Sequence, residues 1–169
     1  MEIRPLTAAD AEAWWELRLE MLDNDPESFA DSAEEHQNTS LEKARQRLAV
    51  SDPASNFILG LFDDGRLAGT AGFFRRPHSK ERHKGHIWGV YVRPQSRGRG
   101  AGRALMQEVI RCAREMGGME QITLVASAHL PARRMYEALG FEPYGVERKS
   151  LKIGTSYVDD VLMVLWLDR

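Results

Sequence analysis

The sequence predicts one α/β domain with a central mixed, mostly antiparallel twisted sheet of about seven strands, flanked by about four helices. The chain has 169 residues, which suits a single domain with a sizeable core. No repeat, low-complexity segment or Gly/Ser-rich linker interrupts it, so residues 1–169 are expected to form a single domain. The spacing of apolar residues predicts strands and helices in the order β-α-α-β-β-β-α-β-α-β-β. Antiparallel hairpins on both sides of one strand–helix–strand unit predict a mixed sheet with helices on both faces.

The N-terminal segment is expected to contain one short strand and two helical regions. Residues 3–6 form a strand that Pro5 stops. Thr7 can cap a helix over residues 8–23, where apolar residues recur with helical spacing. The sequence Asn24-Asp25-Pro26 ends this helix, and the polar residues 27–50 are expected to form a second, interrupted helix.

The rest of the chain alternates strands, turns and two further helices. Strands are expected at residues 57–62, 66–74, 86–92, 122–125, 144–151 and 157–167. Helices are expected at residues 101–116 and 131–139. Asp63-Asp64-Gly65 forms one hairpin turn, residues around Gly154 form another, and residues 75–84 form a basic loop.

Composition excludes several classes of protein. The 23 basic and 25 acidic residues give a net charge of −2, which does not favour a nucleic-acid partner. No apolar run approaches the roughly 20 residues that cross a membrane, and the N-terminus does not resemble a signal peptide. The single cysteine, Cys112, fits a reducing compartment. We therefore expect a cytoplasmic protein without a nucleic-acid or membrane partner.

The most informative segment lies between the strand at 86–92 and the helix at 101–116. It reads Gln95-Ser96-Arg97-Gly98-Arg99-Gly100-Ala101-Gly102-Arg103. Alternating glycines let backbone N–H groups approach a ligand closely, and a helix N-terminus behind them favours an anion. The arginines add positive charge, so the segment predicts a phosphate or pyrophosphate site.

Two nucleotide-binding patterns do not fit this segment. A dinucleotide fold needs G-x-G-x-x-G, but Arg103 stands at the third glycine position and no acidic residue closes the next strand. The G-x-x-x-x-G-K-[ST] pattern of nucleoside triphosphatases is also missing from the sequence.

The segment instead resembles the acetyl-CoA pyrophosphate loop of the GNAT superfamily of N-acetyltransferases, Q/R-x-x-G-x-G/A. Gln95, Gly98 and Gly100 match it. A second family pattern, N-x-x-A-x-x-L-Y-x-x-x-G-F, resembles residues 129–141, where Ala132 and Tyr136 match and His129 replaces the usual asparagine. The element order agrees with the family over nearly the whole chain. The resemblance implies a GNAT-like fold and transfer of an acetyl group from acetyl-CoA to an amine.

The resemblance also implies which residues hold the cofactor. Pantetheine would pair with the backbone of residues 90–92 as if it were another strand, and Gly89 would suit the bulge that the family carries there. The implied contacts with acetyl-CoA are made by Val90, Tyr91, Val92, Arg97, Gly98, Arg99, Gly100, Ala101, Gly102, Arg103, His129 and Tyr136.

Tyr136 occupies the family's tyrosine position, which implies a general acid that protonates the departing thiolate. An amine must lose a proton before it attacks, so a base is also needed. The strand at 86–92 carries no carboxylate, which leaves His86 as the nearest titratable candidate. His83 and His86 lie on opposite faces of a strand and make a poor metal pair, so we expect no metal.

The acceptor is expected to be an amine of a small molecule or a peptide, attacked directly in a ternary complex. Acidic residues between 23 and 35 could attract a cationic amine, or could form a solvated helix face. Two alternatives stay open at this point: a non-catalytic acyl-CoA-binding module, and the acetylating subunit of a complex. The sequence also leaves a homodimer open.

Overall fold

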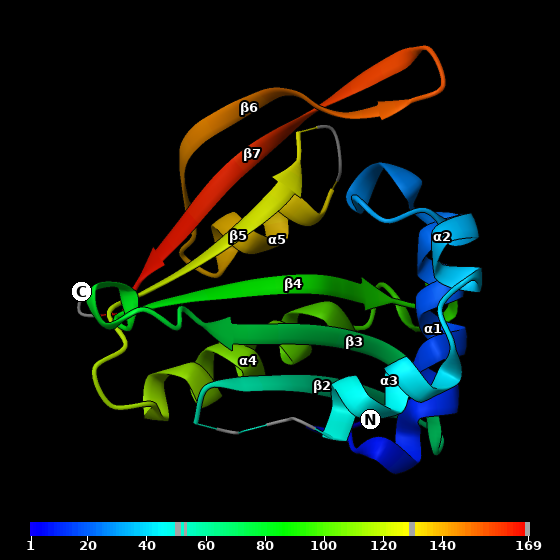
Figure 1. Cartoon of the computed structure of the whole chain (residues 1–169). Coiled ribbons are helices and arrows are strands. Elements are labelled where there is room, and N and C mark those ends of the chain that lie inside the picture. Colours follow the sequence, from blue (N-terminus) through cyan, green and yellow to red (C-terminus); the bar gives the residue numbers. More distant parts are fainter. Residues whose placement is uncertain (50–51, 53, 129–130, 168–169) are drawn as a thin grey trace.

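The computed structural model of the chain describes residues 1–49, 52, 54–128 and 131–167 (Figure 1). Seven strands form its sheet: β1 (Glu2–Pro5), β2 (Asn56–Asp63), β3 (Arg66–Arg75), β4 (Lys84–Val92), β5 (Gln121–Ser127), β6 (Glu142–Ile153) and β7 (Ser156–Trp166). The α-helices are α1 (Ala11–Asn24), α2 (Ala33–Gln37), α3 (Leu41–Ala49), α4 (Ala101–Glu115) and α5 (Ala132–Ala138). Short 3₁₀ turns lie at Ala8–Asp10, Pro26–Ser28, Ser79–Glu81 and Pro94–Ser96.

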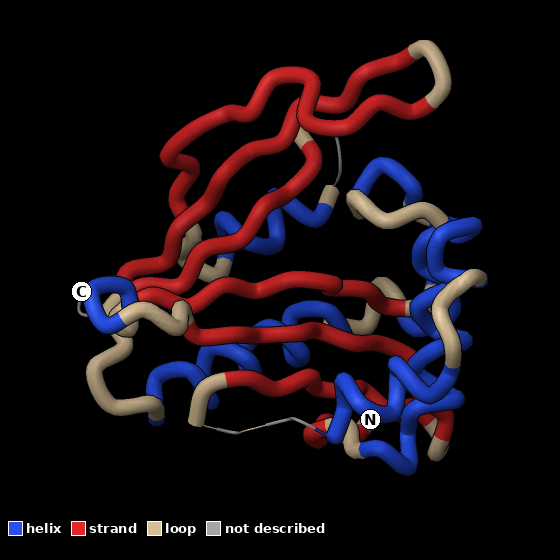
Figure 2. Tube along the Cα trace, viewed as in Figure 1, coloured by secondary structure: helices blue, strands red, loops and turns tan. Residues whose placement is uncertain are grey.

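All seven strands belong to one sheet in the order β1-β2-β3-β4-β5-β7-β6. Every neighbouring pair is antiparallel except β4 and β5, which run parallel across the connection through α4. The predicted mixed, mostly antiparallel sheet is therefore confirmed. Figure 2 shows this sheet with helices on both sides, and the β6–β7 hairpin extending beyond the other strands.

The polar region after α1 differs from the single interrupted helix that was expected. It folds as a 3₁₀ turn followed by α2 and α3. A capping box starts α2, because the Glu35 amide donates to Ser32 Oγ at 3.2 Å and the Ser32 amide donates to the Glu35 carboxylate at 2.8 Å. The local hydrogen bonds of Ser32 begin a new helix there, so the region has two α-helices where one was predicted.

Two apolar cores lie on opposite faces of the sheet. On one face α4 and α5 cover Leu59, Phe73 and Ile122, while on the other α1 and α3 cover Ile58 and Tyr91. Alternation along β2 sends its neighbouring side chains to different cores. The helix α4 packs on the sheet through Leu105, Val109 and Ala113, which recur every four residues and are fully buried.

The strand β4 contains the predicted bulge. Thr70 pairs with Tyr91 and Gly72 pairs with Trp88, so Ala71 alone faces both Gly89 and Val90. Gly89 has φ +61, a conformation that other residues rarely adopt. The bulge keeps Ile87 and Val90 turned toward the core under α4 and Trp88 and Tyr91 turned toward α1.

Within the described residues, no helix is both long enough and apolar enough to cross a membrane.

Candidate active site

The main cavity lies where β4 and β5 separate. The two strands pair only between Lys84–His86 and residues 121–123, at their N-terminal ends. Beyond that point residues 87–92 of β4 and 124–127 of β5 line a cavity of about 480 Å³. Figure 1 shows β5 turning away from β4 toward the end of the sheet nearest α1. The second half of β4 therefore presents peptide groups to a cavity instead of to a neighbouring strand.

The glycine-rich loop closes one end of this cavity. Gly98 and Gly100 adopt φ +77 and +79, and Gly100 is the residue that precedes the first turn of α4. Apart from the chain neighbours, no heavy atom of the described residues lies within 4 Å of where a Cβ would stand on either glycine. Gly98, Gly100 and Gly102 all line the cavity. Backbone amides and the positive end of a 15-residue helix thus meet at the site, as the sequence predicted for an anion.

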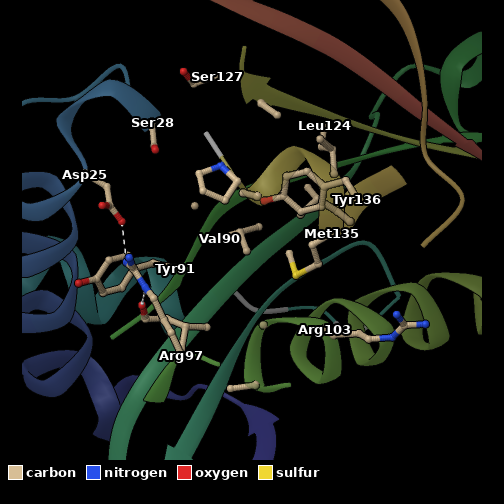
Figure 3. Close-up of a pocket in the computed structure, with 18 of the residues that line it drawn as sticks. Asp25, Ser28, Val90, Tyr91, Arg97, Arg103, Leu124, Ser127, Met135 and Tyr136 are labelled. Atoms are coloured by element: carbon tan, nitrogen blue, oxygen red, sulfur yellow. Dashed lines mark hydrogen bonds and ion pairs between the residues drawn. The ribbon is translucent and has the colours of Figure 1, made fainter. Parts of the chain in front are cut away.

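The structure gives the three arginines of this segment different positions. Arg97 and Arg103 line the cavity, whereas Arg99 forms an ion pair with Asp63 of β2 outside it. Arg97 Nε donates to the Val92 carbonyl at 2.7 Å and Nη2 donates to Asp25 at 2.7 Å (Figure 3). Arg97 therefore ties the loop to β4, and Arg103 is the arginine of the three whose guanidinium forms no ion pair among the described residues.

Tyr136 on α5 lies at the other side of the cavity. Figure 3 shows its hydroxyl pointing away from the helix toward the residues that line the cavity. Its ring meets Phe141 edge-on with 6.1 Å between the ring centroids, and the residue is 6% exposed. Burial raises the pKa of the Tyr136 phenol, because the phenolate would lose its hydration. Tyr136 is therefore a protonated hydroxyl at the cavity wall.

His86 lies outside the cavity, at the last paired position of β4 opposite Thr123. The Thr123 hydroxyl donates to the Gly85 carbonyl at 3.2 Å, so it accepts from His86 Nδ1 at 3.0 Å. This arrangement places the proton of neutral His86 on Nδ1 and leaves Nε2 as the basic nitrogen. Burial, assisted by the nearby Arg76, lowers the pKa of His86 to about 4.

The other residues predicted from the sequence lie partly at the cavity and partly outside the described residues. Val90, Tyr91, Val92 and Ala101, which were predicted to contact acetyl-CoA, all line the cavity. The Tyr91 side chain packs against α1, where its hydroxyl donates to Glu20 at 3.2 Å and accepts from the Asn24 amide at 2.9 Å. The prediction for His129 lies outside the described residues. Among the described residues, no group of three or more His, Cys, Asp or Glu side chains could hold a metal ion.

Sequence reasoning missed Ser127. This residue ends β5, lines the cavity and is 5% exposed, and its hydroxyl has no hydrogen-bond partner among the described residues. A buried hydroxyl without a partner costs about 1–3 kcal/mol, so a ligand that fills the cavity would relieve that cost. Strand alternation could have placed Ser127 on the same face as Thr123, but not beside a cavity.

These features fit acetyl-CoA. The loop amides and Arg103 suit phosphates, the separated edge of β4 suits the amides of a pantetheine arm, and the Ser127 hydroxyl offers one further hydrogen bond. The fit rests on the donors and acceptors that the cavity presents, and it agrees with the residues that the sequence indicated.

Comparison with known proteins agrees with this geometry. The profile of the Acetyltransferase (GNAT) family matches residues 12–141. An aminoglycoside N(6′)-acetyltransferase type 1 from Klebsiella aerogenes is 31% identical over 140 residues, covering 77% of this chain and 86% of the relative. A mycothiol acetyltransferase from Thermomonospora curvata is 30% identical over 141 residues, which cover 82% of this chain. The chain spans only 42% of the length of that second relative.

Solved structures share the fold over nearly the whole chain. A ribosomal-protein-alanine N-acetyltransferase from Brucella melitensis superposes with a TM-score of 0.84 at 25% identity, covering 99% of this chain and 100% of the other. A phosphinothricin acetyltransferase from Sinorhizobium meliloti, solved in complex with acetyl-CoA, gives a TM-score of 0.82 at 24% identity and covers 98% and 88%. With a family match that spans most of its length, the chain belongs to the GNAT family of acetyltransferases.

Proposed function

We propose that the chain transfers the acetyl group of acetyl-CoA to a primary amine by direct attack in a ternary complex. The observation that supports this most is the cavity between β4 and β5, which has the glycine-rich loop at one end and the Tyr136 hydroxyl at its wall. One ligand can therefore place its phosphates at the N-terminus of α4 and its thioester near a proton donor. The solved relative with acetyl-CoA bound has the same fold.

The chain's own residues supply binding and one proton. Loop amides from 98–102 and the Arg103 guanidinium hold the phosphates, and the backbone of residues 90–92 aligns the pantetheine arm. The amine nitrogen forms a bond to the acetyl carbon while the carbon–sulfur bond breaks. Tyr136 gives its proton to the departing sulfur and regains one from solvent. No covalent intermediate with the protein is required.

The amine must also lose a proton. His86 is neutral at pH 7 because its pKa is about 4, and its Nε2 can accept a proton. Since His86 does not line the cavity, it would act through intervening water. A base with so low a pKa drives deprotonation weakly, so we assign the main part of this step to solvent and a minor part to His86.

The experiment that tests the proposal follows thiol release from acetyl-CoA in the presence of panels of amines, amino acids and peptides. Release that depends on both the acceptor and the protein supports an acetyltransferase. Binding of acetyl-CoA, seen as a rise in Tm, without acceptor-dependent release over the whole panel would instead support a non-catalytic acyl-CoA-binding module.

A further inference from the structure

A second cavity, of about 270 Å³, lies between α1, α2 and α3 on the other side of β4. Charged and polar side chains line most of it, among them Arg18, Asp31, Lys43 and Arg47. It shares no lining residue with the main cavity. The proposed acetyl-CoA site uses none of these side chains.

Trp88 lines the main cavity and lies close to two arginines of the second cavity. Its ring lies flat against Gly72, where an added Cβ would come within 2.2 Å of the ring, and the residue also lines the main cavity. The guanidinium of Arg47 lies 4.3 Å from the ring centroid and that of Arg18 lies 5.9 Å from it. Arg18 Nη1 is also 3.9 Å from where a Cβ on Gly89 would stand. Arg18 therefore lies beside the bulge of β4, and Arg47 lies over the ring of Trp88, the residue next to Gly89.

The acidic side chains of this region already have partners within the protein. Asp31 pairs with Arg18, whose side chain is only 11% exposed. Glu35 accepts from the Ser32 amide at 2.8 Å and from the Ser32 hydroxyl at 2.9 Å. His36 donates from Nε2 to the Trp15 carbonyl at 2.9 Å, and burial lowers its pKa, so it adds no positive charge at neutral pH.

Arg47 is left without a carboxylate. Within the described residues it forms no ion pair, and its contact is with the face of Trp88. Burial lowers the pKa of Arg47, and repulsion from Arg18 lowers it further. The cavity lining carries three cationic side chains, Arg18, Lys43 and Arg47, against the two carboxylates Asp31 and Glu35, which leaves an excess of positive charge in a partly enclosed cavity. An incoming anion would offset this repulsion.

We propose that Arg18 and Arg47 bind a carboxylate of the acceptor, so that the preferred acceptor is an amine that also carries a carboxylate, such as an amino acid or a related compound. This inference rests on the proposed function. The planar guanidinium groups suit a carboxylate, and a cation–π contact with Trp88 holds the Arg47 guanidinium over the ring. The acceptor's amine would extend past the bulge at Gly89 toward the main cavity. A polycationic amine is disfavoured at the same place.

The test uses matched acceptors, each an α-amino acid and its α-carboxamide, with acetyl-CoA saturating. The measured quantity is the ratio of kcat/KM for the acid to kcat/KM for the amide, which cancels effects common to both. Replacing Arg47→Gln should lower this ratio roughly 10- to 100-fold, the value of one charge-assisted hydrogen bond. Arg47→Lys, which keeps the charge, should restore part of it. An unchanged ratio in Arg47→Gln overturns the inference.

Arg45→Gln is the matched control, because Arg45 lies on the same helix and faces Glu42 at 3.9 Å instead of Trp88. It should leave the ratio unchanged. Calorimetry on the protein saturated with CoA, where no transfer occurs, then measures amino-acid binding alone. Weaker binding of the acids to Arg47→Gln supports the inference. If the parent binds none of the acids but acetylates other amines, the carboxylate site is wrong while the transferase function stands.

Discussion

The two cavities on either side of β4 are built from different parts of the chain. One end of the main cavity is formed by glycines 98, 100 and 102 and the first turn of α4, beside the separated edge of β4. The second cavity is lined mostly by charged and polar side chains, most of them from α1, α2 and α3, and one of these, Arg47, lies over the Trp88 ring. The first therefore suits a ligand that many proteins share, and the second can change its preference by one substitution.

The largest effect is expected for Gly100→Val. A β-branched residue is strained at φ +79, which costs about 1–3 kcal/mol, and its side chain points into open space where phosphates would approach. Loss of two backbone hydrogen bonds to a charged ligand would weaken CoA binding on the order of 100-fold. Calorimetric titration with CoA measures this.

Gly154→Val is the matched control for that change. Gly154 has φ +60 in the β6–β7 turn, and it also has no heavy atom within 4 Å of an added Cβ. It should lose a similar free energy of unfolding while CoA binds as tightly as before. Equal weakening of CoA binding in both variants would mean that strain spreads through the fold and that the loop is not the phosphate site.

Tyr136→Phe should act on chemistry and not on binding. It removes one oxygen from a buried ring, so kcat should fall roughly 100-fold or more while the KM for acetyl-CoA changes little. Burial raises the pKa of the phenol, so Tyr136 stays protonated in the folded enzyme above the ordinary tyrosine range. Its ionisation should therefore produce no alkaline loss of kcat between pH 6 and 10. Steady-state kinetics across that range measures both effects.

Two outcomes would remove Tyr136 from the mechanism. One is an unchanged kcat in Tyr136→Phe when chemistry is rate-limiting. The other is an equal loss in the control Tyr144→Phe, since Tyr144 is an exposed residue of β6 that does not line the cavity.

Ser127→Ala should have effects of opposite sign on the free and the bound protein. The free protein loses a buried hydroxyl that has no partner among the described residues, so its Tm should stay the same or rise. The complex loses a hydrogen bond, so the Kd for acetyl-CoA should increase by roughly 3- to 10-fold. Thermal unfolding with and without ligand measures both. A drop in Tm of the free protein would show that Ser127 has a structural role instead.

Sequence patterns predicted the fold well where local physical chemistry decides it. The Asp63-Asp64-Gly65 turn and the period of α4 depend on torsion preferences and spacing within one short segment, whereas the bulge at Gly89 was expected from the family resemblance. The region 27–50 was predicted less well, because the Ser32–Glu35 capping box starts a separate helix inside a segment whose polar residues show no clear period. The glycine loop could be placed at the cavity because strand, loop and helix follow one another along the chain.

The acceptor side could not be predicted in this way. Arg18, Arg47 and Trp88 are far apart in sequence, and only the packing of α1 and α3 on the sheet brings them together. From composition, the acidic residues between 23 and 35 left both a cationic acceptor and a solvated helix face open. In the structure Asp31 pairs with Arg18 and Glu35 accepts from the Ser32 amide. These contacts depend on tertiary packing and on a local helix cap, which composition does not show.

The smallest effects are expected for the loop arginines, which look equivalent in sequence. Arg103 lines the cavity without an ion pair among the described residues, whereas Arg99 pairs with Asp63, which also accepts from Ser96 Oγ at 3.1 Å. Arg103→Ala should weaken CoA binding by about 3- to 10-fold, and the difference should shrink in high salt because an exposed charge is screened. Arg99→Ala should weaken it by about twofold or less. Titrations with CoA at two salt concentrations show which of the two variants loses more affinity for CoA. If Arg99→Ala had the larger effect, the phosphates would lie on the Asp63 side of the loop, and the backbone amides at Gly98 and Gly100 would not be their main contacts.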